Sequence, residues 1–130
     1  MFWKTTKKVL IVDDEPELLK LLSVIIDKAG YSATTSHTSA GGMKLALKKK
    51  FDLIILDVYM PILDGWEVLR QIRSNPETQN TPVIMLTSAD TVKDIDKAYS
   101  MKANAYMIKP VDPDAFETKV RELLQENKSE

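Results

Sequence analysis

Four short apolar runs in this chain are each followed directly by acidic, hydroxyl or basic side chains. These polar side chains come from distant parts of the sequence: Asp13 and Asp14, Asp57, Thr87, and Lys109. If they come together, three carboxylates and one ammonium group leave two negative charges uncompensated. Two like charges about 4 Å apart repel by roughly 4 kcal/mol at the effective dielectric near a protein surface. Such a cluster is expected either to take up protons or to bind a cation.

A hard divalent cation with oxygen ligands is the natural partner for these carboxylates. Mg²⁺ is suited to the cluster because it keeps several waters and needs only one or two carboxylates together with phosphate oxygens. Taken singly, each of these residues is more often a turn former, a helix cap or a solvated loop residue. Taken together, they form a complementary set, and the set predicts a Mg²⁺ site.

The elements that must position this set are short apolar strands separated by segments with helical period. Three of the runs are apolar at every position, which is typical of strands buried on both faces, whereas the second is more polar and suits an edge strand. Strand and helix alternate five times, which predicts right-handed crossovers and a parallel sheet covered by helices on both faces. The carboxyl ends of its strands share one edge, where ligands bind. The predicted strands are Val9–Val12, Tyr31–Thr35, Leu53–Leu56, Val83–Leu86 and Ala105–Ile108.

Helix boundaries are indicated by residues with known preferences at helix ends. Pro16 suits the start of the first helix and Gly30 its end. Ser39 and Asp64 are the expected caps of the second and third helices. The fifth helix is expected to begin near Pro113.

Length and composition indicate one compact domain over residues 1–130, with a core at about 8–125. The absence of cysteine excludes disulfides and thiolate metal sites. The apolar runs are far shorter than the roughly 20 residues of a membrane span, and Met1–Lys8 lacks the apolar segment of a signal peptide. A net charge of -1 provides no broad field that would attract nucleic acid or an acidic membrane. We therefore expect a cytoplasmic protein that binds neither directly.

Four segments resemble the receiver domain of two-component response regulators. Their shared pattern is the ordered set DD, DxxMPxxDG, LTS and KP, each on the expected element. The resemblance covers nearly the whole chain and implies a doubly wound, flavodoxin-like α/β fold with strand order 2-1-3-4-5. The segments are VLIVDDEPELL at 9–19, DLIILDVYMPILDGWEVLRQIR at 52–73, PVIMLTSAD at 82–90 and ANAYMIKP at 103–110.

The resemblance implies a phosphoacceptor and a metal site. Asp57 corresponds to the acceptor, which would form an aspartyl phosphate. Asp13 and Asp14 correspond to the acidic pair that holds Mg²⁺, and Asp57 with the backbone carbonyl of Tyr59 would complete the protein ligands. Transfer of a phosphoryl group needs mainly positioning and neutralisation of charge, which such a site provides.

The resemblance also implies a switch. Thr87 and Lys109 would contact the phosphoryl group, and Tyr106 would change rotamer as Thr87 moves toward it. The peptide bond between Lys109 and Pro110 corresponds to a cis bond in the family.

The implied function is that of a phosphorylation-controlled binding module and not of an enzyme, with at most self-catalysed phosphoryl transfer and slow autodephosphorylation. The phosphodonor would be a sensor histidine kinase or a phosphotransfer protein. A downstream protein, which the sequence does not identify, would bind the face made by the fourth helix, fifth strand and fifth helix. The resemblance is compatible with a monomer or with a phosphorylation-dependent dimer.

Alternatives from other classes fit less well. A receiver-like module that binds partners without phosphorylation stays open, although the full residue set argues against it. A haloacid-dehalogenase-like phosphohydrolase would have DxDxT after the first strand, where this chain has DDEPE at 13–17. A flavin carrier on the same fold would need a Ser-, Thr- or Gly-rich phosphate loop at that place, and acidic residues would repel the phosphate.

Some positions depart from the family pattern or tune it. Lys102 stands where the family often has glycine, so a left-handed backbone there would cost roughly 1 kcal/mol. Tyr59 and Ala89 lie where the family varies, and we hypothesise that bulky Tyr59 shields the acyl phosphate from water. Gly65 is expected to give the loop after Asp57 a conformation that a β-carbon would strain.

Overall fold

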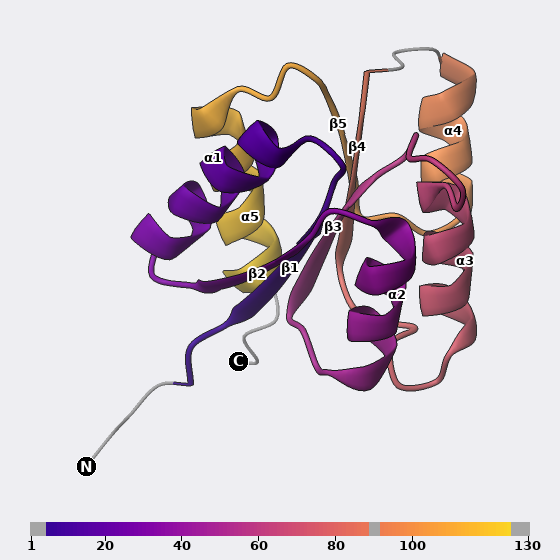
Figure 1. Ribbon diagram of the computed structural model, residues 1–130, viewed down its shortest axis with the longest axis horizontal. Coiled ribbons are helices and arrows are strands. Elements are labelled where there is room, and N and C mark those ends of the chain that lie inside the picture. Colours follow the sequence, from indigo (N-terminus) through magenta and orange to yellow (C-terminus); the bar gives the residue numbers. More distant parts are fainter. Residues whose placement is uncertain (1–4, 89–91, 126–130) are drawn as a thin grey trace.

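The computed structural model describes residues 5–88 and 92–125. Predictions that concern the first four residues and Ala89 therefore lie outside the described part. A parallel sheet of five strands forms the centre, with the order β2-β1-β3-β4-β5 (Figure 1). The predicted fold class and strand order are thereby confirmed. The strands are β1 (Lys8–Val12), β2 (Ser32–Ser36), β3 (Leu53–Asp57), β4 (Val83–Thr87) and β5 (Ala105–Ile108).

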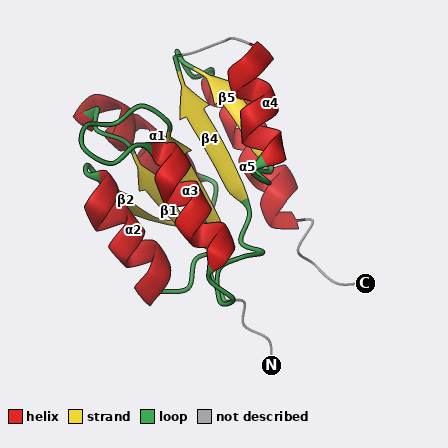
Figure 2. Ribbon diagram, turned by 90° about the vertical axis from the view of Figure 1, so that its right-hand side faces the viewer, coloured by secondary structure: helices red, strands yellow, loops and turns green. Residues whose placement is uncertain are grey.

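Five helices cover the two faces of this sheet. Helices α1 and α5 lie on one face, and α2, α3 and α4 lie on the other, as Figures 1 and 2 show. The helices are α1 (Pro16–Lys28), α2 (Ser39–Lys48), α3 (Gly65–Ser74), α4 (Val92–Ser100) and α5 (Pro113–Gln125). The predicted starts at Pro16 and Pro113 are confirmed.

The core consists of two apolar layers separated by the sheet. Alternate residues of each strand point to opposite faces, so Ile54 and Leu56 pack toward α2 and α3, whereas Leu53 and Ile55 pack toward α1 and α5. Every residue of β3 and β4 is buried, as a sheet covered on both faces requires. The rigid central strands therefore end at defined positions and hold the residues that follow them.

Several element boundaries differ from the predictions by one residue. Strand β1 begins one residue earlier than predicted, β3 and β4 each end one residue later, and β2 is shifted by one residue at both ends. Gly30, with φ of 97°, ends α1, and Tyr31 N donates to Ile26 O at 3.1 Å, so Tyr31 belongs to the turn and β2 begins at Ser32. The cap of α2 is Thr38 and not Ser39, because Thr38 Oγ1 accepts a hydrogen bond from Gly41 N at 3.1 Å. The two adjacent hydroxyl residues are equally plausible caps by residue type.

The loop between β3 and α3 is held by its ends. Asp64 caps α3 as predicted, accepting a hydrogen bond from Glu67 N at 3.0 Å. Gly65 is required for a different reason from the predicted one, because a β-carbon there would collide with the Asp57 carbonyl oxygen. The left-handed residue of this loop is instead Ile62, with φ of 72° and a fully exposed side chain. Close packing of Gly65 therefore holds α3 directly against the end of β3.

Candidate functional site

Three carboxylates meet at the carboxyl edge of the sheet. Asp13 directly follows β1, and Asp57 ends the neighbouring strand β3, where Val12 pairs with Leu56. One oxygen from each of Asp13, Asp14 and Asp57 can be chosen so that all three lie within 4.8 Å of one another. Asp13 and Asp57 are buried, whereas Asp14 is exposed, so the cluster faces solvent on one side. The structure thus brings together the acidic residues that the strand pattern places at one edge.

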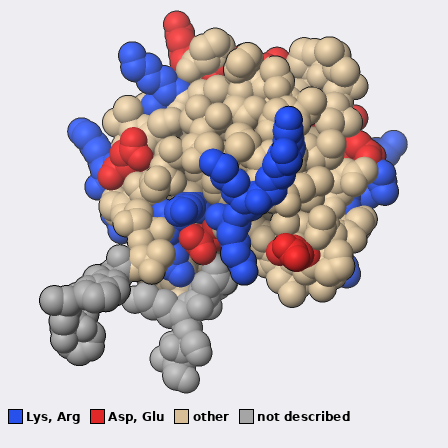
Figure 3. All heavy atoms as spheres, turned by 60° about the horizontal axis from the view of Figure 1, so that its bottom comes forward, with Lys and Arg blue, Asp and Glu red and all other residues tan. Residues whose placement is uncertain are grey.

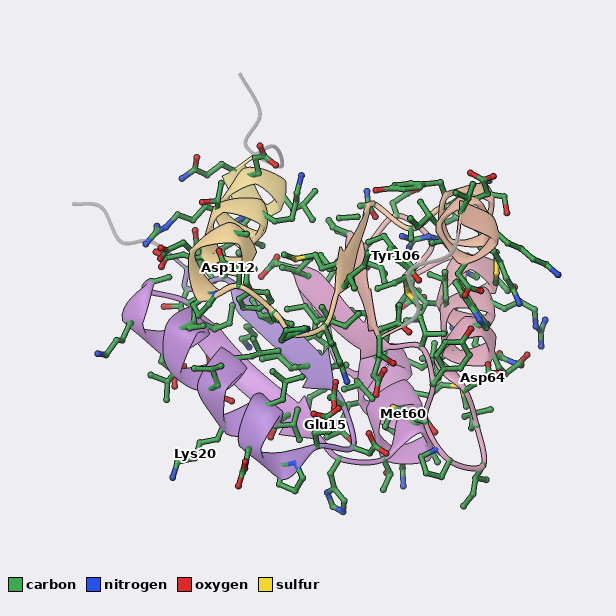
Figure 4. All side chains as sticks on the ribbon, turned by 90° about the horizontal axis from the view of Figure 1, so that it is seen from above. Glu15, Lys20, Met60, Asp64, Tyr106 and Asp112 are labelled. Atoms are coloured by element: carbon green, nitrogen blue, oxygen red, sulfur yellow. The ribbon has the colours of Figure 1, made fainter. Side chains whose placement is uncertain are left out.

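Lys109, which follows β5, reaches across this edge to the carboxylates. Its Nζ lies 2.9 Å from Asp13 Oδ2, 2.9 Å from Glu15 Oε2 and 3.4 Å from Asp57 Oδ2. One ammonium group is therefore shared among three carboxylates. Seen from above in Figure 4, Glu15 lies between α1 and the strand ends, whereas Lys20 projects outward from α1.

Glu15 is the residue of this site that sequence reasoning missed. It lies in the acidic run after β1, but no spacing rule indicates that its side chain reaches a lysine 94 positions away. Its backbone N–H also donates to Asp13 Oδ1 at 2.8 Å, which fixes the orientation of the Asp13 carboxylate. Glu15 therefore contacts both the buried acid and the lysine.

Burial and crowding of like charges shift the pKa values in the cluster. Burial, followed by the charge of Asp13, raises the pKa of Asp57 to about 6, although Lys109 opposes this rise. Burial likewise raises the pKa of Asp13. Burial would lower the pKa of Lys109, but its contacts with Glu15 and Asp13 outweigh that effect and raise it. The site thus holds more negative charge than its one cation neutralises.

The cluster fits a hard divalent cation by its chemistry. All the side-chain groups that could hold a cation are carboxylates, two of them buried and one open to solvent, which leaves room for the waters that Mg²⁺ retains. Asp13 Oδ2 has no aligned hydrogen bond, although it lies close to the Lys109 ammonium. A ligand role for the Tyr59 carbonyl, two residues past Asp57, stays a prediction.

Thr87 and Tyr106 lie on neighbouring strands beside the cluster. Thr87 is buried at the end of β4, and its carbonyl accepts a hydrogen bond from Lys109 N at 2.8 Å. Tyr106 pairs with Met85 and is half-buried against the core on the side of α2, α3 and α4. Because side chains alternate along a strand, Thr87 and Tyr106 face the same side of the sheet. The Lys109–Pro110 peptide bond is cis.

Tyr59 lies at the rim of the site. Its side chain is exposed, and its hydroxyl donates to Asp94 Oδ1 of α4 at 3.3 Å. The desolvation of the phenol, together with Asp94, raises the pKa of Tyr59. The loop that follows Asp57 is therefore linked to α4 by a side-chain contact.

Lysines gather at the opposite end of the molecule. Lys8, Lys49 and Lys50 are exposed at the amino ends of β1 and β3, and Lys and Arg side chains gather on the face turned forward in Figure 3. Lys8 begins β1, and Lys49 and Lys50 precede β3, so all three lie at the end of the sheet away from the carboxylates and do not neutralise the acidic cluster. Within the described residues, no helix is long and apolar enough to cross a membrane.

Comparison with known proteins places this geometry in a family. Residues 9–121 match the response regulator receiver domain. The transcriptional regulatory protein PcoR of Escherichia coli is 36% identical over 95% of this chain and 54% of its own length. The alkaline phosphatase synthesis transcriptional regulatory protein PhoP of Bacillus subtilis is 36% identical over 92% of this chain and 49% of its own length. The chain therefore spans about half the length of these curated relatives.

Solved structures of receivers have the same fold. The chemotaxis response regulator CheY4 of Vibrio cholerae superimposes with a TM-score of 0.86 at 29% identity, over 92% of this chain and all of that one. The receiver domain of the Francisella response regulator 1452 gives a TM-score of 0.88 at 26% identity, over 95% of this chain and 100% of that one. Together with the family match over residues 9–121, these likenesses show that the chain belongs to the response regulator receiver family.

Proposed function

We propose that this receiver accepts a phosphoryl group on Asp57 from a phosphohistidine of a sensor histidine kinase or a phosphotransfer protein. The observation that supports the proposal most directly is the place of the Asp57 carboxylate. The Asp57 residue is 4% exposed at the end of a central strand, and its carboxylate lies beside two other carboxylates and 3.4 Å from the Lys109 ammonium. An aspartate that only forms a turn or caps a helix does not require burial beside other carboxylates and a lysine.

The proposed transfer requires a single displacement at phosphorus. An oxygen of the Asp57 carboxylate attacks the phosphorus atom, the new O–P bond forms, and the N–P bond of the phosphohistidine breaks. The electron pair of that bond stays on the imidazole nitrogen, which then takes up a proton from solvent. The residues of this chain need only position the carboxylate and neutralise charge on the transferring group.

Mg²⁺ is the proposed cofactor of this site. Asp13, Asp14 and Asp57, with the backbone carbonyl of Tyr59, would be its protein ligands. When bound, Mg²⁺ would neutralise negative charge on the carboxylates and on the phosphoryl oxygens. This role accounts for the excess of carboxylates over cations at the edge of the sheet.

We further infer that the phosphorylated site acts through Thr87 and Tyr106. New acceptor oxygens on Asp57 would attract the Thr87 hydroxyl and the Lys109 ammonium, and the half-buried Tyr106 ring would turn inward. The surface that changes would be the face of α4, β5 and α5, where a downstream protein or a second phosphorylated copy would bind. We infer that a single receiver domain over residues 1–130 carries this switch. Its cytoplasmic location stays a prediction.

Incubation with acetyl phosphate and Mg²⁺, followed by intact-mass measurement, tests the proposal. A single phosphoryl adduct is expected with the native chain, and none with Asp57→Asn or with EDTA. The control is Asp96→Asn, which removes an exposed carboxylate from α4 and should leave the adduct unchanged. If acetyl phosphate and a phosphohistidine protein both give no adduct, the chain is a receiver that binds partners without phosphorylation.

A further inference from the structure

We propose that Glu15 is a positioning residue that holds the Lys109 ammonium partly away from Asp57 and so slows the phosphorylation of Asp57. The inference rests on the proposed function, because it assigns a regulatory role within the same site. It concerns a side chain whose contact with Lys109 cannot be read from the sequence.

The geometry of Lys109 supports this role. Its Nζ is 2.9 Å from Glu15 Oε2, with the alignment of a hydrogen bond, and 3.4 Å from Asp57 Oδ2. The lysine is therefore held more closely by Glu15 than by the residue that would receive the phosphoryl group. Asp13 holds it equally closely, at 2.9 Å.

The three contacts of Lys109 with carboxylates differ in the free energy that their loss would cost. The side chains of Asp13 and Asp57 are 0% and 5% exposed, whereas that of Glu15 is 59% exposed. A buried carboxylate that loses its cation is left uncompensated at high cost, but an exposed one is solvated by water. When a phosphoryl group adds negative charge at Asp57, the contact that Lys109 gives up is therefore the one with Glu15.

Glu15 then slows the phosphorylation of Asp57. Its charge holds Lys109 partly away from the acceptor, and it opposes the approach of an anionic phosphodonor to the same edge. Removal of this charge should release Lys109 toward Asp57 and raise the rate of phosphorylation. The expected gain is modest, since an ion pair with one exposed partner is weak.

Initial rates of adduct formation test the idea, measured with acetyl phosphate at saturating Mg²⁺. Glu15→Gln is expected to raise the rate by about two- to fivefold, the ratio that corresponds to a partly exposed ion pair. Glu17→Gln is the matched control, because it removes the same charge from an exposed residue in the first turn of α1. It should react like the native chain.

A second variant separates positioning from simple charge repulsion. Glu15→Asp keeps the charge but shortens the side chain by one methylene group, so it holds Lys109 less well. It is expected to react faster than the native chain, in the direction of Glu15→Gln. Equal rates for Glu15→Asp and the native chain would overturn the positioning role.

The outcomes also separate this inference from the function on which it rests. An adduct on the native chain, with equal rates for Glu15→Gln and Glu17→Gln, would overturn the role of Glu15 and leave the proposed function intact. The absence of any adduct on the native chain would overturn both.

Discussion

Lys109 Nζ lies 3.4 Å from Asp57 Oδ2, the longest of its three contacts with carboxylates. The carboxylate of Asp57, the proposed phosphoacceptor, is thus only partly neutralised by Lys109. Its pKa is raised to about 6 by burial and by the charge of Asp13, compared with about 3.9 for an aspartate in an unfolded chain. This difference has consequences for stability that can be measured.

The first prediction concerns Asp57→Asn in EDTA. Between the two pKa values the folded state binds more protons than the unfolded state, so the native chain loses stability as pH rises from about 4 to about 6. The variant lacks this group and should unfold with a free energy about 2 kcal/mol higher than the native chain at about pH 7.5. Urea unfolding of the native chain and the variant, at about pH 4 and at about pH 7.5, measures the difference. A gain that is as large at about pH 4 as at about pH 7.5 would contradict the assignment to ionisation.

The second prediction is that Mg²⁺ stabilises the folded chain. A ligand that binds only the folded state adds roughly 3 kcal/mol to the free energy of unfolding at 100 times its Kd. Urea unfolding with and without Mg²⁺ should show this gain in the native chain and in Asp96→Asn. Asp13→Asn, which removes a buried carboxylate proposed as a Mg²⁺ ligand, should lose most of this gain. Equal gains in Asp13→Asn and Asp96→Asn would show that the cation binds elsewhere.

The third prediction concerns the lifetime of the acyl phosphate. If the exposed Tyr59 ring shields Asp57 from water, Tyr59→Ala should lose its phosphoryl group about threefold faster, a barrier change of ~0.7 kcal/mol. Tyr59→Phe keeps the ring but loses the hydrogen bond to Asp94, so it should retain the native lifetime. Tyr99→Ala is the control, because both tyrosines have side chains that are 51% exposed. An unchanged lifetime in Tyr59→Ala would rule out shielding.

Much of the fold could be predicted because buried parallel strands leave a strong local signal. The apolar runs that became β3 and β4 are buried at every position, as predicted. The edge where Asp13, Asp57 and Lys109 meet then follows from strand direction alone. The placement of the site is thus a consequence of topology, whereas the chemical roles of its residues stay proposals.

The features that sequence reasoning missed depend on contacts or strain that residue types do not indicate. The sequence places Glu15 after the first strand, but it does not predict the contact of Glu15 with Lys109, because a flexible side chain can point in many directions. Ile62 adopts a φ of 72° that a β-branched residue disfavours, so its type argued against the observed backbone. At Lys102 the departure from the family pattern was itself the signal, and its φ of 69° agrees with the left-handed backbone considered there.

The fourth prediction concerns Lys102, which has a φ of 69°. A β-carbon at positive φ costs about 1 kcal/mol or more, and glycine recovers only part of this because it also gains freedom in the unfolded chain. Lys102→Gly should therefore raise the free energy of unfolding by about 0.5 kcal/mol. Lys102→Ala keeps the β-carbon and should show no such gain. A glycine variant no more stable than the alanine variant would contradict the strain at this position.

The fifth prediction concerns Arg73, in the last turn of α3. Its guanidinium donates to Lys102 O at 3.0 and 2.9 Å and to Thr81 O at 2.7 Å, joining α3 to the segments before β4 and β5. Burial lowers the pKa of Arg73, and its acceptors are neutral carbonyl and amide oxygens. Its role is therefore to hold the chain together where α3 ends.

Arg73→Lys keeps the charge but cannot reproduce this planar fork of hydrogen bonds. Loss of two or more of these hydrogen bonds, which a charged group donates to backbone carbonyls, should lower the free energy of unfolding by about 2 kcal/mol. Arg70→Lys is the control, because Arg70 is exposed and pairs with Glu67 on the same helix, so little change is expected. Both variants should form the Asp57 adduct at the native rate under conditions where they are folded, since Arg73 lies at the end of α3 away from the carboxylates. Equal stability of Arg73→Lys and Arg70→Lys in urea would contradict the role of Arg73.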